Sequence, residues 1–134
     1  MSAVTLTVAL CVGYALAQDP NGGDSDGKHR SAADVAFTEG RLDEAVQLYS
    51  KVIRLEPQNE RIYYKRYLAH QRQRKFQKAL VDLYSALAIK PEYKPCVAGR
   101  AKVLRQLGRC QDALLDLDRL AHLDQNHRDL VDRE

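Results

Sequence analysis

The stretch GRLDEAVQLYSKVIRLEP, from Gly40 to Pro57, returns twice in altered form at intervals of 34 residues. The two further copies are RKFQKALVDLYSALAIKP (74–91) and GRCQDALLDLDRLAHLDQ (108–125). Within each copy, apolar residues recur three or four positions apart, which is the spacing of one face of a helix. Alanine holds the same place in all three copies, at Ala45, Ala79 and Ala113. A fixed period of this length indicates a repeat architecture built from pairs of helices.

The repeat sets the expected helix boundaries. Pro57 and Pro91 end the second helix of their pairs, because proline lacks a backbone donor. Helices are expected near residues 28–39, 43–55, 60–73, 77–89, 94–107 and 111–124. The polar exception within the apolar stripes is a pair of aspartates, Asp82 and Asp116, which is expected to face solvent. Residues 127–134 remain for a short closing helix over the last repeat.

These repeats resemble the tetratricopeptide repeat (TPR) family, whose 34-residue unit is a pair of antiparallel helices. Repeat one has the family's small, turn, aromatic and proline residues at Ala33, Gly40, Ala45, Tyr49 and Pro57. Repeat two departs from the pattern, with Tyr67 at the small position and Arg74 in place of glycine. Repeat three supplies Ala101, Gly108 and Ala113, with Gln125 where proline is usual.

The resemblance implies an all-α fold. The expected architecture is a right-handed solenoid of three TPR helix-turn-helix repeats, at about residues 26–59, 60–93 and 94–127, with a short C-terminal stub helix. Tyr67 is large for a place where two helices approach closely, so the sequence leaves the packing of repeat two open. The TPR domain is expected to occupy residues 28–134 of the 134-residue chain.

The amino-terminal segment predicts the cellular location of the protein. Residues 1–17 contain an apolar run from Val4 to Leu16 and end in Ala-Leu-Ala, which is typical of a secretory signal peptide and its cleavage site. The run is shorter than the roughly 20 residues that a membrane-spanning helix needs. A remnant of a core helix is the alternative. Residues 18–27, rich in Gly and Asp, are expected to form a flexible leader. The expected location is the endoplasmic reticulum lumen or the cell exterior, with no membrane association after cleavage.

The sequence contains no set of residues that predicts catalysis. The four histidines are scattered, and the chain has no glycine-rich phosphate loop and no GxSxG motif. No enzyme activity, cofactor or metal is therefore expected. Cys96 and Cys110 fall at opposite ends of a helix pair, and a helix of about 13 residues separates them by about 20 Å. A disulfide requires Cα atoms within about 7 Å, so both thiols are expected to be unpaired.

TPR proteins bind partners along a groove lined by the first helix of each pair. The matching positions here are Arg61, Tyr64, Lys65, Leu68, Arg72, Lys102 and Arg105. Three interpretations of this basic, partly aromatic stripe remain open: a solvated helix face with buried tyrosines, a peptide-binding groove, and a nucleic-acid surface. The secretory leader and a net charge of only +3 argue against nucleic acid.

Two TPR subgroups differ in what they imply. Cytosolic co-chaperones hold the acidic EEVD tails of Hsp70 and Hsp90 with five Lys, Asn and Arg residues. The matching positions here are Arg30, Asp34, Lys65, Pro95 and Gly99. Of these five positions, only Arg30 is a conservative replacement, because it keeps the positive charge of the clamp residue. Asp34 would repel a carboxylate, so a cytosolic clamp is disfavoured.

The other subgroup is the endoplasmic-reticulum DnaJ/TPR co-chaperones of the kinase-inhibitor type. The signal peptide and the motifs YYKR (63–66) and ALVDLYSALAIKPEY (79–93) resemble their amino-terminal TPR region. The resemblance implies a luminal co-chaperone that holds unfolded or misfolded polypeptides, with a luminal Hsp70 system as an indirect partner. The sequence contains no His-Pro-Asp tripeptide, which a J-domain requires. The alternative function is a TPR adaptor that docks one acidic peptide or protein.

Overall fold

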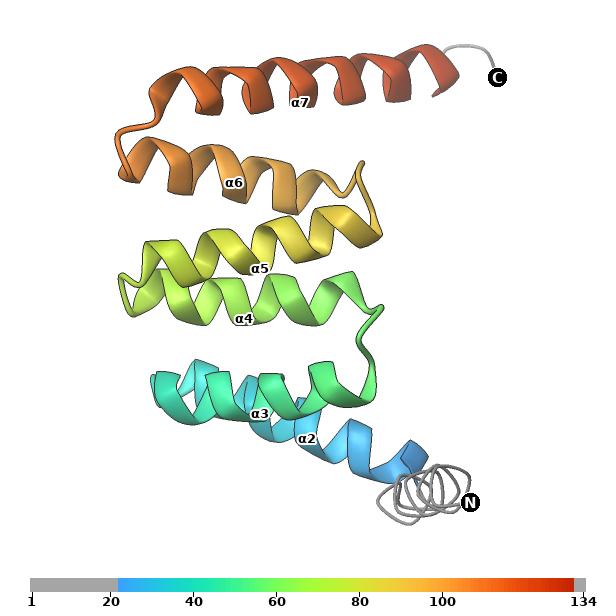
Figure 1. The fold of residues 1–134 in the computed structure, drawn as a ribbon. Helices are drawn as coiled ribbons and strands as arrows, with labels where there is room; N and C mark the ends of the chain where they lie inside the picture. Colours follow the sequence, from blue (N-terminus) through green and yellow to red (C-terminus); the bar gives the residue numbers. More distant parts are fainter. Residues whose placement is uncertain (1–21, 132–134) are drawn as a thin grey trace, which may run out of the picture.

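A computed structural model describes residues 22–131 of the chain. This part of the chain contains six helices and no strand: α2 (Gly22–Thr38), α3 (Leu42–Leu55), α4 (Glu60–Arg72), α5 (Phe76–Ile89), α6 (Lys94–Gln106) and α7 (Cys110–Val131). The helices stack in chain order, with α2 and α3 at one end and α7 at the other (Figure 1). The expected all-α helical repeat solenoid is confirmed.

The helix pairs α2/α3, α4/α5 and α6/α7 correspond to the three sequence repeats. Ala45 and Ala79 have no exposed surface, and Ala113 is 6% exposed, because a methyl group lets the two helices of a pair approach closely. The turn within each pair requires a positive φ, which Gly40 adopts at 80° and Gly108 at 79°. Arg74 adopts the same conformation at 60°, so the turn survives the loss of glycine in repeat two.

The two ends of the domain differ from expectation. Helix α2 begins at Gly22, so residues 22–27 are helical, although they were expected to form part of the flexible leader. Once a helix has nucleated, each further residue adds a backbone hydrogen bond, which favours such an extension. The expected separate stub helix is also absent, because residues 127–131 continue α7 without a break. No proline interrupts this segment, so the helical ladder can continue. The predicted signal peptide, residues 1–17, lies outside the described residues.

Tyr67 is accommodated by a glycine in the next repeat. Its side chain is 3% exposed. A Cβ atom added to Gly99 of α6 would lie 3.0 Å from Tyr67 Cζ and 3.1 Å from Leu83 Cδ2. The large residue in repeat two is therefore matched by a missing side chain opposite, and close packing is retained.

The apolar core falls into two clusters. The larger one joins the second and third repeats and includes Tyr67, Leu83, Val97 and Val103. The smaller one belongs to the first repeat, and Ile62 is its only buried member from α4 among the described residues. The junction between repeats one and two therefore depends more on polar contacts than the next junction does.

The two described thiols are unpaired, as expected. Cys96 is buried in α6, and burial raises its pKa to about 12. Cys110 is exposed at the first residue of α7. A buried thiol with a raised pKa is mostly protonated at neutral pH and is a poor nucleophile.

Candidate functional site

The first helices of the three pairs are linked into one surface by side-chain contacts. Lys65 Nζ in α4 lies 2.7 Å from Asp34 Oδ2 in α2. Gln71 Nε2 donates to Gln106 Oε1 in α6 at 2.7 Å. Because α4 contacts both neighbours in this way, the predicted groove residues of α4 and α6 lie on a continuous surface, which we call the first-helix surface.

An apolar strip runs along α4 on this surface. Tyr64 lies with its ring centroid 5.6 Å from that of Tyr67 and 6.1 Å, edge-on, from that of Tyr93. Leu68 packs against the same core cluster, and both Tyr64 and Leu68 remain half-buried. These two side chains are therefore held in place from below and still present apolar surface to a partner.

The predicted groove cations divide into two groups. Lys65 is paired with Asp34, and the guanidinium of Arg72 lies 4.1 Å from the centroid of the Phe37 ring. Arg72 Nη1 also donates to the carbonyl oxygen of Phe37 at 3.3 Å. Both cations are thus committed to holding α4 against α2.

The remaining cations are available to a partner. Arg61, Lys102 and Arg105 are exposed, and none of them forms an ion pair within residues 22–131. Arg61 lies in the first turn of α4, where its backbone N–H donates to Asn59 Oδ1 at 3.2 Å. Among the predicted groove cations, those without an internal contact of the charged group therefore lie on α6 and at the beginning of α4, and not along the whole of α4 as the sequence suggested.

Three of the five carboxylate-clamp positions, Arg30, Asp34 and Lys65, already make internal contacts. Asp34 accepts from Lys65 and, at 2.6 Å, from the hydroxyl of Tyr49. Burial, together with this hydrogen bond, raises the pKa of Tyr49. Arg30 forms an ion pair with Glu56. A carboxylate ligand at these positions would have to displace these partners.

The expectation that Asp82 and Asp116 face solvent is wrong. Asp82 is 1% exposed and Asp116 is 5% exposed. Arg66 Nε donates to both carboxylate oxygens of Asp82, at 3.1 and 3.0 Å. In the same way Arg100 donates to Asp116, at 2.7 Å from Nε and 2.6 Å from Nη2. Each buried carboxylate is stable because a guanidinium satisfies it within the same helix pair.

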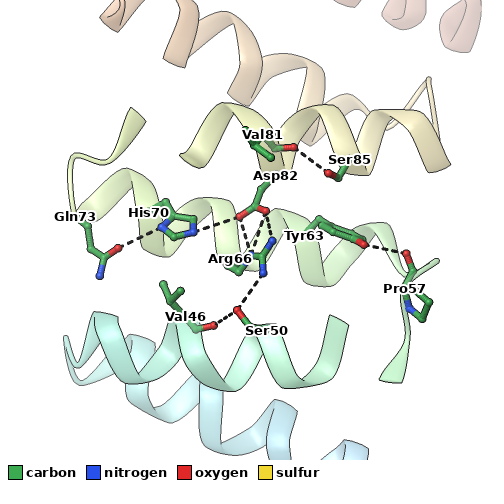
Figure 2. A network of polar contacts seen from close by, with 10 residues as sticks. All are labelled: Val46, Ser50, Pro57, Tyr63, Arg66, His70, Gln73, Val81, Asp82 and Ser85. Atoms are coloured by element: carbon green, nitrogen blue, oxygen red, sulfur yellow. Dashed lines mark hydrogen bonds and ion pairs between the residues drawn. The ribbon is translucent and has the colours of Figure 1, made fainter. Parts of the chain in front are cut away.

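The Asp82 pair is part of a wider network that reaches the first repeat. Arg66 Nη1 donates to Ser50 Oγ of α3 at 3.0 Å, and His70 Nε2 lies 3.6 Å from Asp82 Oδ2 (Figure 2). Burial lowers the pKa of His70, and the charge of Asp82 opposes that shift in part. The arginine precedes its aspartate by 16 residues in both pairs, and this recurring spacing is the sequence signal that could have revealed them.

The described part of the chain holds no cluster of three His, Cys, Asp or Glu side chains suited to a metal ion. Within residues 22–131, none of the helices combines the length and apolar composition that crossing a bilayer requires.

Together, the stacked helix pairs define a helical-repeat protein that exposes the first-helix surface. Residues 33–74 match the family model described as TPR repeat. This match supports a TPR repeat within residues 33–74, from α2 to the end of α4.

Several solved structures share the fold. The TPR2B domain of yeast Sti1, in a pHsp70 complex, has a TM-score of 0.71 and 22% identity, covering 78% of this chain and 83% of that one. The first TPR of Spaghetti (RPAP3), bound to the HSP90 peptide SRMEEVD, has a TM-score of 0.69 and 26% identity, covering 75% and 82%. MamA (MSR-1) has a TM-score of 0.71 and 20% identity over 80% of this chain. The chain spans 62% of the length of that MamA structure.

Proposed function

We propose that this chain is a non-enzymatic binding module of the secretory pathway that holds unfolded polypeptides on its first-helix surface, as a luminal co-chaperone does. The observation that carries the proposal is the apolar strip of Tyr64 and Leu68, set between cations that already make contacts within the domain. Because Lys65 is paired with Asp34 and the guanidinium of Arg72 is held against the Phe37 ring, the centre of the surface offers apolar contact between two cations that are held in place. Apolar segments exposed in an unfolded chain fit such a surface.

The size of the strip suits weak and reversible holding. Because both side chains are already half-buried, covering their remaining surface contributes only about 1 to 2 kcal/mol, before the costs of association are subtracted. The tyrosine ring is already ordered by Tyr67 and Tyr93, so little side-chain entropy is lost when a client binds. Such a site would release its client readily, as a holding chaperone must.

The apolar strip is tested by aggregation of an unfolded client. Reduced, unfolded α-lactalbumin is the probe, and light scattering measures its aggregation in the presence of the chain. The variant Tyr64→Ala with Leu68→Ala is expected to lose suppression. The matched control is Val81→Ala, because Val81 is 62% exposed on α5, outside the first helices. Equal loss in both variants would contradict the proposal, provided that thermal unfolding shows both to be folded.

An adaptor that docks one acidic partner is the second candidate, and a specific observation favours it. Lys102 and Arg105 are exposed and unpaired on α6, within the described residues. The Spaghetti domain of similar fold was solved with the acidic peptide SRMEEVD. An adaptor of this chain would bind its acidic partner through α6, and not through the internally paired clamp positions.

Charge variants separate the two candidates. Lys102→Ala with Arg105→Ala is expected to change only the salt dependence of client holding. The control, Lys51→Ala with Arg54→Ala, removes the same charge from α3, where both side chains are exposed. If the α6 variant loses all binding while the apolar variant keeps it, the adaptor is the better account.

The secretory location rests on residues 1–17 and is a separate part of the proposal. A fluorescent reporter fused after residue 134 is expected to enter the endoplasmic reticulum. The same fusion without residues 1–17 is expected to remain in the cytosol. Identical distribution of the two fusions would contradict the proposed location and would leave the binding chemistry of the surface untouched.

A further inference from the structure

The outer face of α7 is an apolar stripe at the end of the stack. Leu114 is 53% exposed and Leu117 is 51% exposed, and Asp118 and Ala121 are exposed beside them. Positions 114, 117, 118 and 121 follow the spacing of one helix face. Helix α6 packs on one side of α7, and no helix of the described chain stacks on the other (Figure 1). Large exposed apolar residues in a row mark surfaces that bind other proteins.

The repeat shows what such a face does elsewhere in the molecule. The same positions one repeat earlier, on α5, include Leu80, Leu83 and Leu87, which are 5%, 0% and 7% exposed. They lie in one core cluster with Cys96 and Val103 of α6, the first helix of the following pair. The stripe on α7 is therefore equivalent to a surface that a neighbouring helix covers.

The covering helices share a chemical pattern. In α4, Arg66 lies between the buried residues Ile62 and Ala69, and in α6, Arg100 lies between Cys96 and Val103. Each arginine reaches the same repeat position of the preceding helix. Arg66 donates to Ser50 of α3, and the guanidinium of Arg100 lies 5.3 Å from the centroid of the Tyr84 ring of α5.

At that repeat position α7 carries a carboxylate. Asp118 is exposed and forms no hydrogen bond or ion pair with the described residues. An arginine placed like Arg66 or Arg100 would meet opposite charge there. Complementary charge at the centre of an apolar contact fixes the register of the two helices.

We propose that the outer face of α7 docks an amphipathic helix of another protein, in which apolar residues flank an arginine that pairs with Asp118. This site is separate from the first-helix surface and goes beyond the function proposed above.

Two observations concern the described residues and a second copy as occupants of the stripe. Helices α3 and α5 end at Leu55 and Ile89, and the chain then turns back, whereas α7 runs past the equivalent residue to Val131. The described chain therefore does not fold back over the stripe. A second copy would present α2 in the covering position, where Ala32 occupies the place of the arginine and supplies no cation.

The probe is a synthetic peptide of residues 93–107, which contains the chain's own covering helix with Arg100. Fluorescence anisotropy of the labelled peptide, in reducing buffer, measures binding to the complete chain. Saturable binding is expected for the wild type, and Leu117→Glu should weaken it by at least about tenfold. The matched control is Leu115→Glu, which should stay within about twofold. Leu115 is 69% exposed and, like Val81 at the same repeat position, points away from the stripe.

A charge exchange tests the arginine. Asp118→Arg is expected to weaken binding of the peptide, and an Arg100→Glu peptide is expected to recover binding to that variant. Absence of saturable binding to the wild type would overturn the proposal, and so would an equal loss in Leu115→Glu and Leu117→Glu. Sedimentation of the chain without peptide identifies the other occupant: a dimer that Leu117→Glu abolishes would show that a second copy covers the stripe, and would also overturn the proposal.

Discussion

Replacing Asp82 by alanine is expected to be among the most damaging single changes in the domain. Asp82 is 1% exposed, and the paired Arg66 side chain is 21% exposed. Removing one partner of a buried ion pair costs about 3 to 5 kcal/mol, because the other charge is left without compensation. Water reaches part of the stranded guanidinium, so a loss of about 3 kcal/mol in the free energy of unfolding is expected. Because the total free energy of unfolding of a domain is only about 5 to 15 kcal/mol, this loss would be a large part of it.

Removing both members of the pair is expected to be less damaging than removing one. Replacing both members by apolar residues, as in Arg66→Met with Asp82→Leu, leaves no buried charge and is expected to restore stability to within about 1 kcal/mol of the wild type. Urea unfolding followed by far-UV circular dichroism at neutral pH measures all three proteins.

The control is an exposed pair of the same chain. Lys94 Nζ lies 2.7 Å from Asp124 Oδ1, with side chains 41% and 59% exposed, so Lys94→Ala should cost less than about 1 kcal/mol. The account of the buried pair is refuted if Asp82→Ala costs no more than Lys94→Ala, or if the double variant is as unstable as the single one.

Three further changes test individual features of the fold. Arg74→Gly should raise the free energy of unfolding by up to about 1 kcal/mol, since Arg74 has a φ of 60° that glycine adopts without strain; a lower melting temperature would contradict this. Because burial lowers the pKa of His70 below 6.5, the folded state resists protonation, so stability should be complete above about pH 6.5 and fall as the pH drops through the folded-state pKa. Melting temperatures between pH 8 and 5 should show this decline in the wild type, and His70→Leu should flatten it. Gly99→Ala should lower the free energy of unfolding by about 1 to 3 kcal/mol, because its Cβ would lie 3.0 Å from Tyr67 Cζ. An unchanged midpoint of urea unfolding would show that this contact is loose.

The repeat made the fold predictable from sequence. Alanine at positions 45, 79 and 113 and proline at 57 and 91 fix the helix pairs through local sterics, which depend little on distant residues. The ends of α2 and α7 were less predictable, because helix extension depends on small differences in propagation. Tyr67 could not be judged alone, since its fit depends on Gly99, 32 residues later in the next repeat.

The sequence indicated which residues share the first-helix surface, but it did not indicate which of their charges are paired. The sequence assigned Lys65 and Arg72 to a basic groove. Whether these cations are free to bind a partner depends on Asp34 and Phe37, which lie in another repeat. Asp82 was misjudged for the same reason, because a carboxylate within an apolar stripe is acceptable only when a cation from a facing helix reaches it. Pairing across helices decides both cases, and helix periodicity alone does not contain that information.

In our proposal, unfolded chains bind on the first-helix surface at the apolar strip of α4. Site-specific photocrosslinking tests it most directly, with a photoreactive amino acid placed at position 68 in one protein and at position 81 in another. Val81 is a suitable reference because it is exposed on α5, outside the surface. With reduced, unfolded α-lactalbumin, the account predicts crosslinks from position 68, few from position 81, and none from either with the native client. Equal crosslinking from both positions, or crosslinking from position 81 alone, would contradict it.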